Sequence, residues 1–147
     1  MNRDFAEMLA ALSAAGADFM VIGAYAVAVY ARPRATGDLD IWIRSTPDNA
    51  ARVWAALSAF GAPLHELTRD DLATDDLVFQ IGVAPNRIDL LTTISGVSFD
   101  DAWNRRTTVE LWGLAVPVIG RDDLITSKRA AGRPRDLADL ADLEGGG

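Results

Sequence analysis

Hydrophobic and polar residues alternate along the chain with two different periods, which predict a mixture of helices and strands. Apolar residues between Phe5 and Ala15 recur at the spacing of one helix face and stop at Gly16. The segment Leu39–Ile43 instead alternates with a period of two, as a half-buried strand does. By the same criteria we expect helices at residues 5–15, 24–31, 47–60, 99–105, 122–131 and 135–143, and strands at 19–22, 39–43, 77–83, 87–94, 109–112 and 115–118.

The order of these elements predicts an α/β (α+β) fold, in which helices flank a mixed β-sheet and a helical segment closes the chain. The 147 residues suffice for one hydrophobic core, but a second full domain would not fit. We therefore expect residues 1–144 to form a single domain, followed by a flexible glycine tail at residues 145–147.

Composition limits the chemistry that this domain can perform. The chain has no cysteine, a single histidine (His65), and 21 acidic against 14 basic residues, for a net charge of −7. Thiolate zinc sites, iron–sulfur clusters and sites that need several histidines are thereby excluded. The acid excess argues against a broad basic surface that coats nucleic acid. Any metal site should consist of oxygen ligands, which favours magnesium, manganese or calcium.

The apolar stretches are too short to span a membrane. The longest of them, Phe19–Ala31, ends at Arg32, and the N-terminus lacks the basic start and the cleavage site of a signal peptide. The sequence therefore predicts a cytoplasmic protein without membrane contact.

Carboxylates at the beginning of two predicted strands are the candidate chemistry. Asp38 and Asp40 are two residues apart, so they project from the same side of their strand, whereas Leu39 faces the other side. Asp89 lies early in another predicted strand, between apolar residues. Carboxylates held this close repel one another unless a cation or a proton lies between them. Together the three could hold two Mg²⁺ or Mn²⁺ ions roughly 3.5–4 Å apart, the arrangement of two-metal phosphoryl-transfer sites.

A candidate phosphate site precedes the paired carboxylates. Gly23 ends one predicted strand and opens a helix, where the missing side chain and the unpaired backbone N–H groups allow close approach of a triphosphate.

The combination of these features resembles the nucleotidyltransferases of the polymerase β superfamily. Gly23-Ala24 is followed after 13 residues by Asp38-Leu39-Asp40, and the isolated Asp89 comes later in a strand. The family usually has glycine or serine at the position of Ala24, so the backbone donor is retained here while a serine hydroxyl is absent. The resemblance implies Asp38, Asp40 and Asp89 as catalytic metal ligands, with a nucleoside triphosphate as substrate.

Two flanking segments are similar to abortive-infection (AbiEii-type) nucleotidyltransferase toxins and their small relatives. One is Arg34-Ala35-Thr36 before the acidic pair, and the other runs from Asp123 through Lys128 to Arg135-Asp136. This resemblance implies nucleotide binding by a set of residues in three segments: Gly23, Ala24, Arg34, Thr36 and Lys128. It further implies an acceptor hydroxyl on tRNA or another RNA, on a protein or on a small molecule, and a role as a toxin with a cognate antitoxin or partner chain.

Each candidate also has a purely structural interpretation. Asp38 and Asp40 could form a solvated junction between a loop and a strand, and Asp89 could cap a hairpin. Lys128 could stabilise the end of its helix, and Arg34 could be an exposed loop charge. Sequence alone favours this kind of interpretation for Arg133 and Arg135, as surface charges or as partners of Asp136 and Asp139.

Three functions therefore remain open at this point. Nucleotidyl transfer is the first, and a hydrolase that uses the same carboxylates is another, because two metals would serve either reaction. A catalytically silent module that binds a nucleotide or a partner, as an antitoxin or regulatory subunit, is the third.

Overall fold

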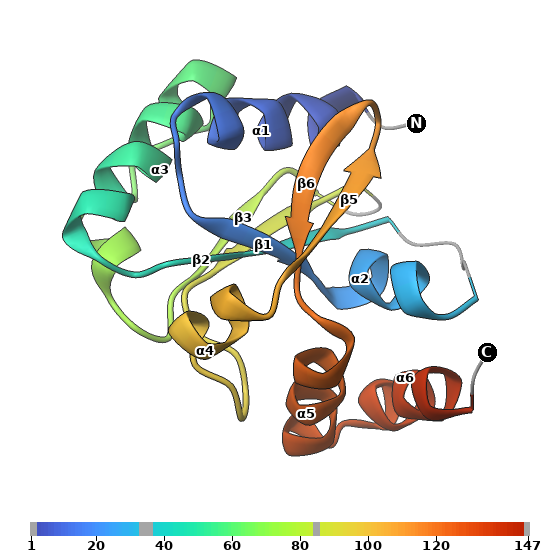
Figure 1. Ribbon diagram of the computed structural model, residues 1–147. Coiled ribbons are helices and arrows are strands. Elements are labelled where there is room, and N and C mark those ends of the chain that lie inside the picture. Colours follow the sequence, from blue (N-terminus) through green and yellow to red (C-terminus); the bar gives the residue numbers. More distant parts are fainter. Residues whose placement is uncertain (1–2, 33–36, 84–85, 146–147) are drawn as a thin grey trace.

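A computed structural model describes residues 3–32, 37–83 and 86–145 of the chain (Figure 1). The elements follow the order that the sequence predicts. The helices are α1 (Arg3–Ala14), α2 (Gly23–Tyr30), α3 (Pro47–Phe60), α4 (Phe99–Asn104), α5 (Arg121–Ala131) and α6 (Pro134–Glu144), with one 3₁₀ turn, η1 (Asp71–Ala73). The strands are β1 (Phe19–Ile22), β2 (Leu39–Ile43), β3 (Val78–Ile81), β4 (Ile88–Leu91), β5 (Thr107–Leu111) and β6 (Leu114–Val118).

The six strands form one mixed sheet in the order β3-β4-β2-β1-β6-β5. β2 pairs in parallel with β4, and β1 pairs in parallel with β6, while the other neighbouring strands are antiparallel. The predicted α/β class with a mixed sheet is therefore confirmed. The parallel pair matters most for the site, because it brings Leu39 and Ile88, which are 49 residues apart in sequence (88 − 39 = 49), into register on neighbouring strands.

Helices α1 and α3 cover one side of the sheet, whereas α4, α5 and α6 lie on the other side (Figure 1). The amphipathic face of α1 is buried against the sheet and α3 through Phe5, Met8, Leu9 and Leu12. In the described residues, no helix is long and apolar enough to cross a membrane. Apolar side chains are buried on both faces of the sheet, because Met20 and Trp42 alternate with the equally buried Val21 and Ile41 along β1 and β2.

Capping residues determine where several of the helices begin or end. Thr46 caps α3 by accepting a hydrogen bond from the Asn49 N–H, and Ser98 caps α4 in the same way with Asp101. Side-chain oxygens at this position satisfy N–H groups that have no partner within the helix. Gly145 lies at the C-terminal cap of α6, where its N–H donates to the carbonyl of Ala141, and residues 146–147 lie outside the described residues.

One predicted strand ends earlier than expected. Trp112 was expected inside the strand 109–112, but it lies in the turn between β5 and β6, with φ of +51° beside Gly113 at +79°. A two-residue hairpin turn needs positive φ at both positions, which glycine adopts without strain. The tertiary structure offsets the strain at Trp112, because its ring packs against Phe5 and Tyr25.

Candidate active site

The parallel pairing of β2 and β4 brings the predicted carboxylates together. Asp40 and Asp89 are directly opposite one another in the register of the two strands, and Asp38 immediately precedes β2. Their side chains share the face of the sheet opposite to Leu39 and Ile41, which are fully buried in the core. The structure therefore places the three acids on neighbouring strands, and their role as metal ligands stays a prediction.

All three carboxylates line a single cavity of about 810 Å³, a volume typical of small-molecule sites. Gly23 and Ala24, at the start of α2, line the same cavity, and Lys128 of α5 lies on its wall. The structure therefore brings together most of the residues that the sequence nominates. Arg34 and Thr36 lie outside the described residues, so their predicted contacts with nucleotide remain predictions.

Arg87 also lies among the carboxylates, although sequence reasoning treated it only as the start of a strand. Its Nε and Nη2 donate to the two oxygens of Asp89 at 2.8 and 3.1 Å. The same Nη2 lies 3.4 Å from Oδ2 of Asp38. The spacing could have revealed it, because a residue two positions before Asp89 points to the same side of the strand.

Asp40 carries the strongest electrostatic perturbation in the cavity. Burial, followed by the charges of Asp89 and Asp38, raises the pKa of Asp40 to about 6, while Arg135 and Lys128 act in the opposite direction. A carboxylate whose charge is opposed by its surroundings is well suited to bind a cation.

A glycine at position 23 leaves room for the side chain of Asp40 as well as for a ligand. Its φ is +68°, a conformation that glycine adopts without strain. A Cβ atom at this position would lie 2.2 Å from Oδ2 of Asp40, far closer than two such atoms can approach. The sequence assigned Gly23 to phosphate binding, and the structure adds that the glycine makes room for a candidate metal ligand.

The opposite wall of the cavity contains a buried network of charges on α5 and α6. The ammonium of Lys128 lies 3.4 Å from Asp136 and 3.0 Å from Asp139, both almost fully buried. Arg133 donates to Asp136 through its Nε at 2.7 Å. Although burial raises the pKa of Asp136, hydrogen bonds from Arg133 and the charge of Lys128 hold it below its ordinary value.

Arg133 and Arg135 both line the cavity, although the sequence favoured a structural interpretation for them. Arg133 is a partner of Asp136, as one of the sequence interpretations expected. The positive charge of Arg135 acts on Asp40 from the α6 side. The cavity thus has an acidic wall on β2 and β4 and a wall with basic side chains on α5 and α6.

The donor set fits a hard divalent cation, because carboxylate oxygens are the preferred ligands of Mg²⁺ and Mn²⁺. As the side chains lie, however, no three acidic residues in the described part of the chain converge on a point that could hold an ion. The guanidinium of Arg87 lies between Asp38 and Asp89 and supplies positive charge there.

A family model described as "Nucleotidyl transferase of unknown function (DUF2204)" matches residues 1–144. No curated protein is significantly similar to the chain in sequence. The likeness to this family therefore rests on nearly the whole chain, including both walls of the cavity.

Solved structures share the fold at low sequence identity. A protein assigned as a nucleotidyltransferase from Thermotoga maritima is 16% identical, with a TM-score of 0.64 over 97% of this chain and 91% of its own. The lincosamide antibiotic adenylyltransferase LnuA, solved with lincomycin, is 11% identical, with a TM-score of 0.63 over 100% and 98%. The antibiotic-resistance factor ANT(2″)-Ia is 13% identical, with a TM-score of 0.63 over 97% and 80%. At these identities the likeness establishes the fold.

Proposed function

Since the chain belongs to the nucleotidyl transferase family DUF2204, we propose that it moves a nucleoside monophosphate from a nucleoside triphosphate to an acceptor hydroxyl with the help of Mg²⁺ or Mn²⁺. The observation that carries this proposal is the register of the parallel strands. Asp40 and Asp89 face one another across β2 and β4, in the cavity that also contains Gly23 and the basic residues of α5 and α6.

Asp38, Asp40 and Asp89 would hold the metal ions in this proposal. Two bound divalent ions would activate the attacking oxygen and stabilise charge on the leaving group. The acceptor hydroxyl oxygen attacks the α-phosphorus in line, its proton passes to a carboxylate such as Asp89, and the bond to the β-phosphate oxygen breaks to release pyrophosphate. Asp89 suits the role of orienting the acceptor, because it lies directly opposite Asp40 in the register of the two strands and lines the same cavity.

The phosphates would lie between α2 and the basic wall. The N-cap residue of α2 is Ile22, whose side chain makes no capping hydrogen bond, so the first N–H groups of the helix are available for phosphate oxygens. Arg135 and Lys128 add positive charge on the opposite side of the same cavity. The sequence predicts Lys128 as a phosphate-binding residue, and we propose Arg135 as a second one because it lines the same cavity.

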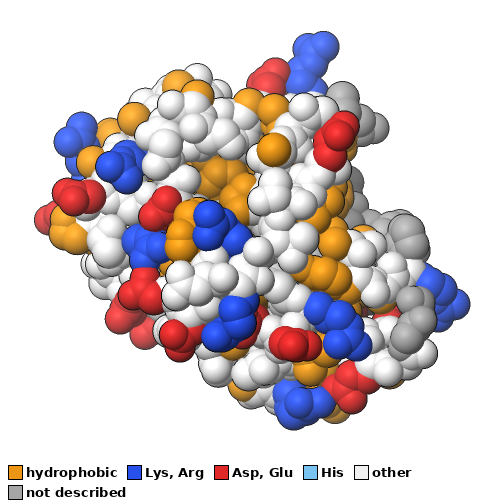
Figure 2. All heavy atoms as spheres, viewed as in Figure 1, with side chains coloured by type: hydrophobic (Ala, Val, Ile, Leu, Met, Phe, Trp, Pro, Cys, Tyr) orange, Lys and Arg blue, Asp and Glu red, His pale blue; other side chains and the backbone are white. Residues whose placement is uncertain are grey.

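For the acceptor, we favour a small hydroxyl compound. Structural neighbours include an adenylyltransferase for lincosamide antibiotics and an antibiotic-resistance factor. The charged side chains also give no broad basic surface on the face in Figure 2, where basic and acidic groups are interspersed. The resemblance to abortive-infection toxins supports a different acceptor, tRNA, another RNA or a protein, with a cognate antitoxin as partner. In either case we place the enzyme in the cytoplasm, as a single domain over residues 1–144.

A catalytically silent nucleotide-binding or partner-binding module is the second candidate. It is favoured by the position of Arg87, whose guanidinium lies where cations would bind the carboxylates. It would keep the fold and the cavity but transfer nothing.

Two measurements test the proposal. First, the thermal stability of the protein is followed while Mg²⁺ and each of ATP, GTP, CTP and UTP are titrated. A ligand at 100 times its dissociation constant adds about 2.7 kcal/mol to the free energy of unfolding. Second, labelled triphosphates are incubated with protein and cell extract. Label on a small molecule, RNA or protein identifies the acceptor, whereas a stability increase without any labelled product supports the silent module. Triphosphate hydrolysis independent of an acceptor would indicate a hydrolase.

A further inference from the structure

Arg87 contacts Asp38 through both its backbone and its side chain, and it contacts Asp89 through its side chain. Its backbone N–H donates to Oδ1 of Asp38 at 3.3 Å, and its carbonyl accepts from the N–H of Leu39 at 2.9 Å. The guanidinium then spans from Asp38, at 3.4 Å, to both oxygens of Asp89, at 2.8 and 3.1 Å. One residue therefore bridges two of the three carboxylates on which a metal site would depend.

This bridge uses the same oxygen atoms that would coordinate a metal. A bidentate pair between arginine and a carboxylate is among the stronger hydrogen-bonded contacts, and the side chain of Asp89 is only 10% exposed. The side chain of Arg87 is 31% exposed, so its guanidinium can leave toward solvent while its backbone stays in place. A divalent cation could then replace a single positive charge at Asp38 and Asp89.

We propose that Arg87 is an internal competitor for the metal: its guanidinium holds Asp38 and Asp89 in the free enzyme and must leave before a divalent cation can bind them. This inference rests on the proposed function of the same carboxylates. It assigns Arg87 a regulatory role in the site rather than a contact with the reacting atoms.

The consequence is a coupling between metal and nucleotide. If the bridge is open only part of the time, the apparent dissociation constant of the metal is its intrinsic value divided by the open fraction. Phosphate oxygens of the substrate add ligands to the metal and so favour the open state. By linkage, nucleotide tightens metal binding and metal tightens nucleotide binding by the same factor. The free enzyme would thus stay largely without metal until its substrate arrives.

The test measures Mn²⁺ affinity of the nucleotide-free protein by the electron paramagnetic resonance signal of free Mn²⁺. For Arg87→Gln we expect binding about tenfold tighter than in the wild type, as for an open fraction near one tenth. Arg87→Lys retains the charge but cannot form the bidentate fork, so we expect an intermediate tightening of about threefold.

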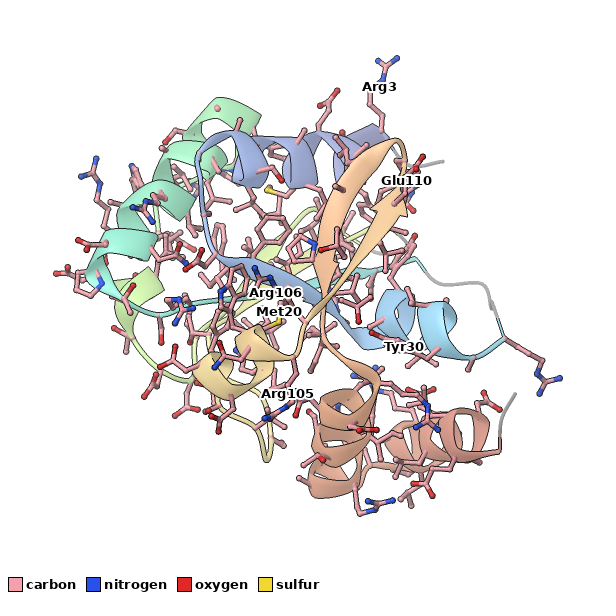
Figure 3. The ribbon with its side chains drawn as sticks, viewed as in Figure 1. Arg3, Met20, Tyr30, Arg105, Arg106 and Glu110 are labelled. Atoms are coloured by element: carbon pink, nitrogen blue, oxygen red, sulfur yellow. The ribbon has the colours of Figure 1, made fainter. Side chains whose placement is uncertain are left out.

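Arg105→Gln provides a matched control. Arg105, at the end of α4 (Figure 3), forms the same kind of bidentate pair with a buried acid, Asp123 of α5, at 3.0 and 2.8 Å. Neither residue of this pair lines the cavity of the carboxylates. Its substitution removes an equivalent ion pair, and Mn²⁺ affinity should stay at the wild-type value.

Equal or weaker Mn²⁺ binding by Arg87→Gln overturns the inference. So does tightening in Arg87→Gln with none in Arg87→Lys, because the effect would then be general charge repulsion rather than release of a bridge. If Arg87→Gln does not fold, as judged by circular dichroism, Arg87→Lys decides the question alone. Failure of the proposed function has a different signature: wild-type protein would show either no Mn²⁺-dependent stabilisation by any of the four triphosphates or stabilisation without a labelled product, whatever the Mn²⁺ affinity of the variants.

Discussion

Asp40 and Asp136 are carboxylates that line the same cavity, yet their surroundings act on them in opposite directions. Burial and two acidic neighbours raise the pKa of Asp40 to about 6. Asp136 is also buried, but Arg133 and Lys128 hold its pKa below the ordinary value. The difference comes from the partners, since burial opposes ionisation in both cases.

This contrast distinguishes two walls of the cavity. We assign the chemistry to the β2–β4 wall, and the buried charge network of α5 and α6 stabilises the fold around it. The β2–β4 wall keeps carboxylates close together in an arrangement that costs stability unless a cation joins them. The network of α5 and α6 joins its acids to Lys128 and Arg133 within the fold. Groups held against their preferred charge state are frequent at functional sites, and paired groups are more often structural.

The largest expected effect is on activity. Replacement of Asp38 and Asp40 together by asparagine should lower nucleotidyl transfer by roughly 10³-fold or more, because a metal-based reaction loses several kcal/mol of transition-state stabilisation. The measurement is the rate of pyrophosphate release with the acceptor identified by labelling. Circular dichroism of the double variant should match that of the wild type, and retained activity would contradict the assignment of the acidic wall.

The next effect is on stability and has opposite signs at the two walls. Asp136→Asn should lower the free energy of unfolding by about 3 kcal/mol, because it leaves Lys128 and Arg133 with a buried neutral partner. The measurement is urea-induced unfolding at pH 7.5 with chelator present.

Asp40→Asn is the matched substitution at the other wall. It removes a charge that burial and two acidic neighbours oppose, so it should raise the free energy of unfolding by about 1–3 kcal/mol in chelator. Destabilisation of similar size in both variants would show that the two walls are equivalent and would remove the basis for the comparison.

The sequence pointed to the individual carboxylates of the acidic wall because the signals that mark each of them are local. A period of two places Asp38 and Asp40 on one side of a strand, and Asp89 has the same apolar setting. The basic wall was harder to predict, since Lys128 and Asp136 belong to different helices separated by a turn at Gly132. Which basic residue is already paired depends on how α5 packs against α6, and helical periodicity does not contain that information.

Two other features depended on contacts between distant segments. Gly23 and Asp40 are 17 residues apart, 40 − 23 = 17, and only the pairing of β1 with β2 shows that a Cβ would strike the carboxylate. The bridge from Arg87 to Asp38 likewise requires the parallel pairing of β2 and β4. Sequence patterns identified the strands, but the order of strands in the sheet had to come from the structure.

A smaller effect concerns pH. The folded-state pKa of Asp136 lies below its ordinary value of 3.8. The unfolded chain therefore takes up the proton first as pH falls, and the stability contributed by Asp136 is present above about pH 4 and is lost as pH falls through the lowered pKa. Urea unfolding of the wild type between about pH 2 and pH 7 should show this loss. Asp136→Asn should show a shallower decline, and parallel curves would mean that Asp136 does not contribute to the acid sensitivity.

The smallest effect distinguishes the two basic residues that could meet the triphosphate. Arg135→Ala should raise the dissociation constant of the triphosphate about tenfold, the loss of one charge-assisted contact, with little change in stability. Lys128→Gln should instead destabilise the fold, because the Lys128 side chain is only 12% exposed and is paired with Asp136 and Asp139. Nucleotide affinity is measured by thermal shift and stability by urea unfolding. If Lys128→Gln lowers affinity without loss of stability, then Lys128 acts on the phosphates and its pairing with Asp136 and Asp139 is not needed to support the fold.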